Sequence, residues 1–337
     1  MQTAEATYGS DKGGLVWGYH FEPGQAARLV DCDTAAQLLG SSRGGSHWFL
    51  WLHFSLSNAA SERWLRQNLS LPEAFHESLH QAVGSTRLEQ DGDSLLAVIH
   101  DVLFEFTFDA SDVSTVSLCV EPRVLVSARP RPLRSLDRLR TAVKSGTHFR
   151  SPAELLAHLL RDQANVLVEI VRHSTTRVDT IEDKLLAHRI AASRAELGSL
   201  RRVLVRLQRL LAPEPAALFR LLSRPPDWVG EEDLQDLRQA AEEFSTVVAD
   251  SAALVERIKL LQEELAALIN EQNNRILFVL TVVTVLAVPF NLIAGLFGMN
   301  VGGVPLAHAP HGFAIIIGMV AGFTALAAVL ILRRRGS

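Results

Sequence analysis

Oxygen-bearing polar side chains recur at an even spacing just before and within a long apolar stretch near the end of the chain. In steps of about 3.5 residues they form one series, which consists of Asn270, Asn274, Thr281, Thr284 and Asn291. The same steps pass through the apolar residues Leu277 and Val288 and continue to Gly295 and Gly298. A period of about 3.5 places all of these residues on one side of a helix in a left-handed bundle. We call them the polar series.

Lipid offers amides and hydroxyls no hydrogen bonds, so the polar series must face protein or water. In one interpretation its members bond across a helix interface, each contact contributing about 1 kcal/mol. In the other, several copies of the helix surround a pore, and rings of oxygen atoms replace part of an ion's hydration shell. We favour the pore, because the series extends through the full depth of the first apolar run, Ile276–Phe297. Leu277 and Val288 are then hydrophobic constrictions.

No acid or base belongs to the polar series within the apolar stretch. A fixed charge therefore cannot relay protons there. Selection by charge must come from dipoles, from the mouth of the pore, or from acids at its other entrance such as Glu263 and Glu271.

The stretch that holds the series is long enough to cross a membrane twice. No charged side chain occurs from Ile276 to Leu332, and the runs Ile276–Phe297 and Phe313–Leu332 each reach the roughly 20 residues that a spanning helix needs. Arg275 precedes the first run and Arg333–Arg335 follow the second, whereas the loop between them has neither Lys nor Arg. The positive-inside rule therefore predicts a multi-pass protein of the inner (plasma) membrane with both termini in the cytoplasm.

The first span continues a longer helix. From Glu231 there is no proline or glycine before Pro289, and acidic residues suit a helix N-terminus, so we expect one helix over Glu231–Phe297. It would be about 100 Å long and would need lateral partners, which indicates an oligomer. Residues 231–275 carry 11 acids and 4 bases, whereas residues 172–209 carry 9 bases and 4 acids. We therefore expect an acidic stalk packed on a basic hairpin, or else two solvated faces.

The residues before the stalk predict an α+β fold. Trp48–Phe54, Leu95–Phe106 and Val113–Ala128 are typical of strands, the last as a hairpin near Glu121-Pro122. Asn58–Leu69 and Pro72–Val83 are expected helices. The pattern leaves the strand order open.

After Ser151-Pro152 the chain is Leu-rich at helical spacing, with Gly198 as a possible break. Residues 1–14 are expected to be a loose tail without a signal peptide. The expected domains are residues 1–150 as a cytosolic α/β domain, 151–230 as a helical hairpin region, 231–275 as the stalk helix, 276–297 and 313–332 as transmembrane helices, 298–312 as the outer loop and 333–337 as a basic tail.

Composition narrows the function class. A net charge of −4 argues against binding of nucleic acid. Cys32 and Cys119 stand far apart in no metal-binding pattern, so we expect buried free thiols. The sequence has no Gly-rich phosphate loop and no nucleophile elbow, which argues against an ATP-driven pump.

One motif points to an enzyme. His76-Glu77-Ser78-Leu79-His80 matches H-E-x-x-H, in which two His residues on a helix bind zinc and the Glu is a general base. The extended form of the motif fails at Val83 and Thr86, and a third ligand such as Glu105 would have to be recruited. We expect no protease activity and an ordinary amphipathic helix; a zinc-sensing site at His76 and His80 is the alternative.

A second pair of His residues lies in the predicted outer loop. His308 and His311 are three residues apart, and imidazole suits zinc better than magnesium. They are either plain polar loop residues or a transient zinc-collecting site, which must be weak because conducted ions have to leave.

Gly298-Met299-Asn300 ends the first of the two spans, behind the long acidic helix and the large N-terminal region. This arrangement resembles the CorA superfamily of divalent-cation transporters. The following residues 301–305, Val-Gly-Gly-Val-Pro, look like the ZntB zinc-transporter branch and lack the acidic loop residue usual in the magnesium branch. The resemblance implies a funnel-shaped homopentamer without a cofactor, in which the first span lines the pore. It also implies that Gly298, Met299 and Asn300 form the outer selectivity mouth.

The resemblance further implies transport of Zn²⁺, in which coupling to protons is an open question. Two alternatives remain at this point. The chain is a magnesium or cobalt channel of the same superfamily, or it is a membrane-anchored zinc sensor or stalk protein that transports nothing.

Overall fold

The computed structural model describes residues 9–40, 48–80, 86–186, 193–299 and 310–334. Its contacts divide the chain into two units, Met1–Leu261 and Gln262–Ser337. The N-terminal unit is an α+β domain with a long helical hairpin, and the second unit consists of apolar helices.

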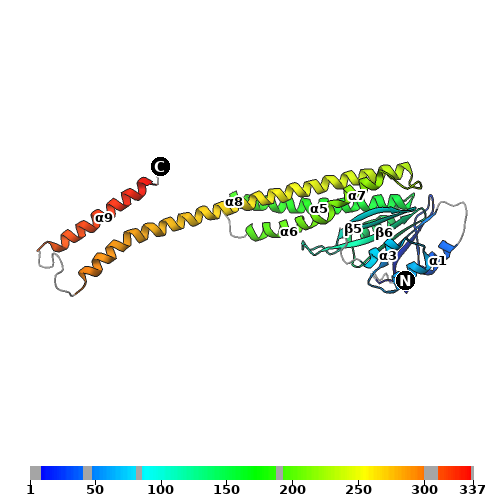
Figure 1. The fold of residues 1–337 in the computed structure, drawn as a ribbon, viewed down its shortest axis with the longest axis horizontal. Coiled ribbons are helices and arrows are strands. Elements are labelled where there is room, and N and C mark those ends of the chain that lie inside the picture. The colour runs from blue at the N-terminus through cyan, green and yellow to red at the C-terminus, as the bar shows by residue number, and fades with distance from the viewer. Residues whose placement is uncertain (1–8, 41–47, 81–85, 187–192, 300–309, 335–337) are drawn as a thin grey trace. The chain divides into compact units, whose positions relative to one another are not determined.

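A mixed sheet forms the centre of the N-terminal unit (Figure 1). Among the described residues its strand order is β2-β1-β3-β7-β6-β5-β4. The strands are β1 (Leu15–Phe21), β2 (Arg28–Val30), β3 (Phe49–Ser55), β4 (Arg87–Asp91), β5 (Ser94–Val102), β6 (Val113–Glu121) and β7 (Val124–Arg129). β3 and β7 pair in parallel, with Leu52 opposite Val126, and the other described pairs are antiparallel. The three predicted strand regions are present, and the hairpin turns after Glu121 as expected.

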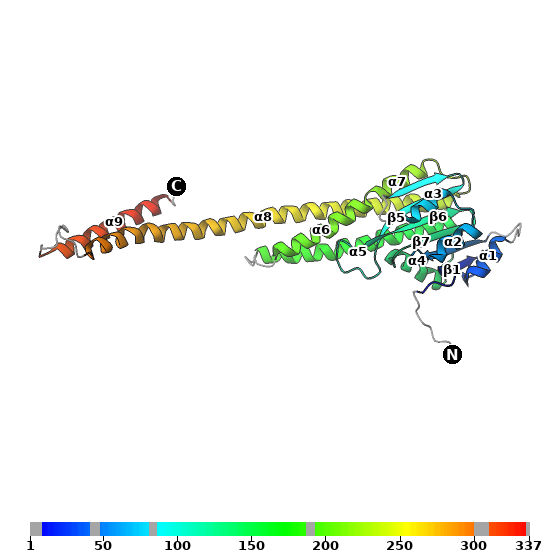
Figure 2. The same ribbon diagram turned by 60° about the horizontal axis from the view of Figure 1, so that its bottom comes forward.

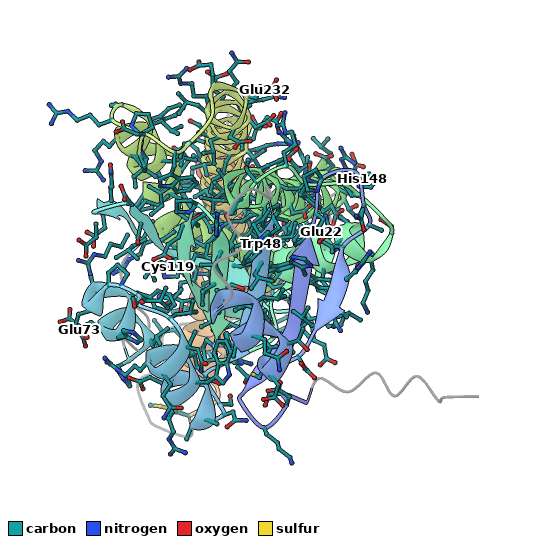
Figure 3. All side chains as sticks on the ribbon, turned by 90° about the vertical axis from the view of Figure 1, so that its right-hand side faces the viewer. Glu22, Trp48, Glu73, Cys119, His148 and Glu232 are labelled. Atoms are coloured by element: carbon teal, nitrogen blue, oxygen red, sulfur yellow. The ribbon has the colours of Figure 1, made fainter. Side chains whose placement is uncertain are left out.

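Helices cover both faces of this sheet, because successive side chains of a strand point to opposite faces. The helices of the unit are α1 (Cys32–Gly40), α2 (Ala60–Asn68), α3 (Glu73–His80), α4 (Arg134–Lys144), α5 (Pro152–Leu186), α6 (Ser193–Leu211) and α7 (Pro213–Leu222). Leu52 and Phe54 pack with α1, α2 and α3, whereas Phe49 and Trp51 pack with α4, α5, α7 and the start of α8 (Glu231–Phe297). Figure 3 shows the result: Glu73 on α3 and Glu232 on α8 lie on opposite sides, with Cys119 between them.

One expectation about this unit is wrong: Gly198 does not break a helix, because it lies inside α6. Residues 1–8 of the expected loose tail lie outside the described residues. In the part that is described, the Asp11 carboxylate accepts hydrogen bonds from the backbone N–H groups of Gly13 and Leu15, at 2.9 and 3.0 Å, so this part is not loose. The expectation of free buried thiols at the two cysteines is confirmed.

The long helix has the bounds expected from the sequence. α8 runs without interruption over Glu231–Phe297, and Pro289 lies inside it. A second apolar helix, α9, covers Gly312–Arg334. Among the described residues α8 alone is long and apolar enough to cross a membrane; the apolar part found in α9 is the shorter segment Gly312–Ala327. The second span therefore stays a prediction.

Candidate cation pathway

The hydroxyl groups of the polar series present oxygen acceptors. Thr281 donates its hydroxyl hydrogen to the carbonyl oxygen of Leu277, and Thr284 donates to that of Leu280, each at 2.8 Å. A threonine oxygen keeps its lone pairs when its one hydrogen is given to the preceding turn of the helix. This side of α8 therefore offers oxygen lone pairs to whatever lies beside it, which suits a cation and not an anion.

The opposite side of α8 faces α9. The two helices line an apolar cavity of about 1140 Å³, to which α8 contributes Phe290, Ile293, Ala294 and Phe297. No member of the polar series lines this cavity. Successive residues of an α-helix are about 100° apart, so Thr284 lies about 180° around the helix from Ile293, whereas Asn291 lies about 60° from Ala294. The threonines of the polar series are thus turned away from α9, Asn291 lies near the edge of the cavity, and all three are exposed.

The end of α8 favours a small residue. The N–H of Gly298 donates to the carbonyl oxygen of Ala294 at 2.9 Å, and a Cβ at Gly298 would lie 3.0 Å from that oxygen. Met299 follows with half of its surface exposed. Asn300 and His308 lie outside the described residues. His311 is exposed directly before α9, and its carbonyl oxygen accepts the N–H of Ile315.

The other end of the polar series is open as well. Asn270 and Asn274 are exposed on α8, and so are Glu263 and Glu271. The structure thus leaves oxygen atoms available on this side of α8 both before and within the apolar stretch. A Cβ atom at Gly295 would have no described atom within 4 Å, so this position is also open.

Charge pairing between the stalk and the hairpin differs from the expected pattern. Arg257 of α8 pairs with Asp179 at 2.8 Å and with Glu182, both on α5, so the base is on the stalk and the acids are on the hairpin. A second pair has the charges the other way round: Arg161 of α5 lies 3.8 Å from Glu243 of α8. α5 runs beside the first part of α8 (Figure 2). The expected acidic-on-basic pairing is therefore mixed in sign, because single well-placed partners and not the net charge of each helix decide which ions meet.

The H-E-x-x-H segment forms helix α3, and its two imidazoles have different surroundings. His76 is buried at 3% exposure, its Nδ1 atom has no described partner, and burial lowers its pKa. His80 is exposed, and its Nε2 atom lies 3.2 Å from a Glu62 oxygen. Glu105 lies in an exposed loop after β5. Among the described residues no group of three or more His, Cys, Asp or Glu could hold a metal ion.

Comparison with known proteins decides the family. The family model described as "CorA-like Mg2+ transporter protein" matches residues 46–334. The chain belongs to this CorA-like family. The resemblance inferred from the Gly-Met-Asn motif and its context is thereby confirmed. The family consists of ion transporters and not enzymes, which also confirms that the chain is not a protease.

Individual relatives support the same assignment. The chain is 28% identical over 333 residues to the divalent cation transporter CmaX of Pseudomonas aeruginosa, with 96% of this chain and 97% of that protein covered. It is 25% identical over 263 residues to the zinc transport protein ZntB of Pectobacterium atrosepticum, with 78% and 80% covered. The chain is thus a divalent cation transporter of a membrane-embedded family.

Solved structures share the fold. The full-length CmaX protein superposes with a TM-score of 0.81 at 24% identity, over 98% of this chain and all of that one. The CorA magnesium transporter from Methanocaldococcus jannaschii gives a TM-score of 0.75 at 19% identity, over 93% and 96%. Both likenesses include the N-terminal α+β unit and the long helix.

Proposed function

We propose that this CorA-like chain carries divalent cations, zinc foremost, across the inner membrane through a central pore lined by α8 from five copies. The observation that carries the proposal is the placement of the polar series: its threonine oxygens lie on the side of α8 opposite the cavity shared with α9. If α9 and lipid cover one side of α8, the polar side is the one that other copies of α8 face. Symmetric copies then bring the same oxygen atoms into rings.

The proposed path uses the residues in order. A hydrated cation meets Gly298, Met299 and Asn300 at the outer mouth, where the amide oxygen of Asn300 replaces water from its outer hydration layer. Rings at Asn291, Thr284 and Thr281 follow, separated by the apolar rings of Val288 and Leu277. Because no fixed charge lies along this path within the span, a cation is held weakly at each ring and can leave. Asn270 and Asn274 continue the oxygen surface towards the cytoplasm.

Zinc is proposed over magnesium on the chemistry of the outer loop. Residues 298–312 contain His308 and His311 and no acidic residue, and zinc accepts imidazole whereas magnesium prefers carboxylate and water. Relatives named as zinc transport proteins support this choice. A magnesium or cobalt channel is the second candidate, because the family model and one solved structure carry magnesium in their descriptions.

The test is a flux measurement on purified full-length protein in liposomes, with a zinc-sensitive dye inside. We expect zinc entry that excess external magnesium inhibits only weakly, and we compare entry with and without a pH gradient to measure coupling to protons. Magnesium entry that zinc does not reduce would favour the second candidate. Liposomes that admit neither metal would contradict transport altogether.

The His residues of the outer loop provide a prediction about metal choice. Replacing both His308 and His311 with alanine should raise the KM for zinc about fivefold, the equivalent of about 1 kcal/mol in binding. The KM for magnesium or cobalt should change less, because those ions depend little on imidazole. His148→Ala in the N-terminal unit is the matched control and should leave both constants unchanged. An unchanged zinc KM in the double variant would show that His308 and His311 are polar loop residues that do not bind zinc.

A further inference from the structure

Three titratable side chains outside the cation path are buried together in the N-terminal unit. His100 and Asp101 are consecutive on β5, and Glu214 is the second residue of α7. They are exposed by 1%, 4% and 1%, and Gln163 of α5, at 3%, lies among them. We call these four residues the buried cluster. Neither the polar series nor the outer loop uses them.

Each carboxyl group of the buried cluster joins β5 to a helix. Glu214 accepts the backbone N–H of His100 at 2.8 Å with Oε1, and it accepts the amide of Gln163 at 2.7 Å with Oε2. Asp101 accepts the backbone N–H and the hydroxyl of Ser135, at the start of α4, at 2.9 and 2.8 Å. The two acids therefore hold α7, α5 and α4 against one strand.

The ring of His100 has one described hydrogen-bond partner. Thr86 gives its one hydroxyl hydrogen to the carbonyl oxygen of Leu210, at 3.1 Å, so its oxygen is left to accept from Nδ1 of His100 at 3.2 Å. Nε2 of His100 is buried and has no partner in the described part of the chain.

No Lys or Arg in the described part of the chain balances the two carboxyl groups. Within the described ranges neither has a Lys or Arg at ion-pair distance, and the nearest titratable partner of Glu214 is His100, whose Nδ1 lies 3.8 Å away. On β4, which packs against α7, Arg87 and Glu89 pair with each other at 2.7 Å. On α5, the neighbouring Asp162 lies 3.7 Å from His158.

Two acids buried without a cation favour the protonated form, because a charge without water is costly and the second charge repels the first. Burial above all, together with the nearby Glu214, raises the pKa of Asp101 to about 7, although the hydrogen bonds from Ser135 and Val102 act in the opposite direction. Burial likewise raises the pKa of Glu214, while its hydrogen bonds with His100 act in the opposite direction.

We propose that the buried cluster is a proton-binding site whose occupancy controls how firmly the corner of α6 and α7 docks on the sheet. When one of the two carboxyl groups is already protonated, a proton from solvent that adds to the other makes the cluster neutral. Its loss leaves one negative charge, which the hydrogen bonds from Ser135, Gln163 and the backbone of His100 stabilise in part and which water can stabilise further. A cavity of about 10 Å³, lined in part by Asp101 and Gln163, is close to the size that one water molecule needs. Gln163 Oε1, which is buried and without a described partner, gives such a water an acceptor.

The corner leads directly to the long helix. α6 ends at Leu211, α7 covers Pro213–Leu222, and α8 begins at Glu231. A weaker hold of Glu214 on β5 therefore loosens the element from which α8 starts. The consequence for transport rests on the proposed function, whereas the proton site itself does not.

The experiment compares full-length wild type with Glu214→Gln in detergent, by thermal unfolding and by amide hydrogen exchange from about pH 5 to pH 8. Glutamine keeps the volume of the side chain and the acceptor for the backbone N–H of His100. A raised carboxyl pKa means that the folded state holds the proton, so wild-type Tm should fall as pH rises and level off above about pH 7. Exchange in α7, corrected for intrinsic rates, should rise over the same range.

In Glu214→Gln we expect a flatter Tm profile and α7 exchange that no longer depends on pH. Glu231→Gln, whose parent side chain is 72% exposed, is the matched control and should keep the wild-type profile. Wild-type profiles in both Glu214→Gln and Asp101→Asn would overturn the proton site. If these variants do not fold, infrared spectra of wild type with ¹³C-labelled aspartate and glutamate decide it, because the absence of a protonated carboxyl band at about pH 6.5, where exposed carboxyl groups are ionised, would also overturn it. If wild type shows the expected profiles but transports no cation in liposomes, the result would count against the proposed function alone.

Discussion

Asn300→Ala should abolish divalent cation uptake while the oligomer still assembles. Asn300 ends the Gly-Met-Asn motif, and the proposed mouth needs its amide oxygen from each copy to meet a hydrated cation. A hydrogen bond to a charged group contributes about 1.5–3 kcal/mol, and every 1.4 kcal/mol changes a rate or equilibrium tenfold. Loss of the whole ring should therefore reduce uptake by at least about a hundredfold.

The measurement is zinc entry into liposomes, paired with light scattering of the purified variant to establish its oligomeric state. Gln235→Ala removes an exposed amide from α8 in the N-terminal unit and serves as the control for loss of an amide. It should retain wild-type flux. Wild-type flux in an assembled Asn300→Ala protein would show that the motif does not select ions through this side chain.

The second large effect concerns the polar side of α8. Thr284→Val and Asn291→Leu keep approximately the size of each side chain and remove its oxygen, so we expect each to lower flux at least about tenfold. Val283→Leu changes a neighbouring residue that belongs neither to the polar series nor to the lining of the cavity shared with α9. That variant should transport nearly as wild type does.

Liposome flux and the oligomeric state are again the two measurements. Equal losses in Val283→Leu and Thr284→Val would mean that the pore lies along a different side of α8. A loss of assembly instead of flux in Asn291→Leu would support the interface interpretation, in which the amides bond between helices.

Features that depend on residues close together in the chain could be predicted from the sequence. The polar series follows from a repeat of about 3.5 residues, and the absence of breakers before Pro289 predicted the bounds of α8. The turn after Glu121 and the strands on either side were predictable for the same reason, since periodicity and turn residues act locally. The Gly-Met-Asn motif at the end of α8 then indicated the family.

Only the tertiary structure decided which elements meet. β3 and β7 lie side by side although Leu52 and Val126 are far apart in the sequence, and no repeat records such a pairing. The side of α8 that faces α9 became visible only through the cavity that the two helices share. His100 and Glu214 read as ordinary polar residues of a strand and a helix. Their significance comes from burial and from the absence of a described cation beside them, and both depend on how distant segments pack.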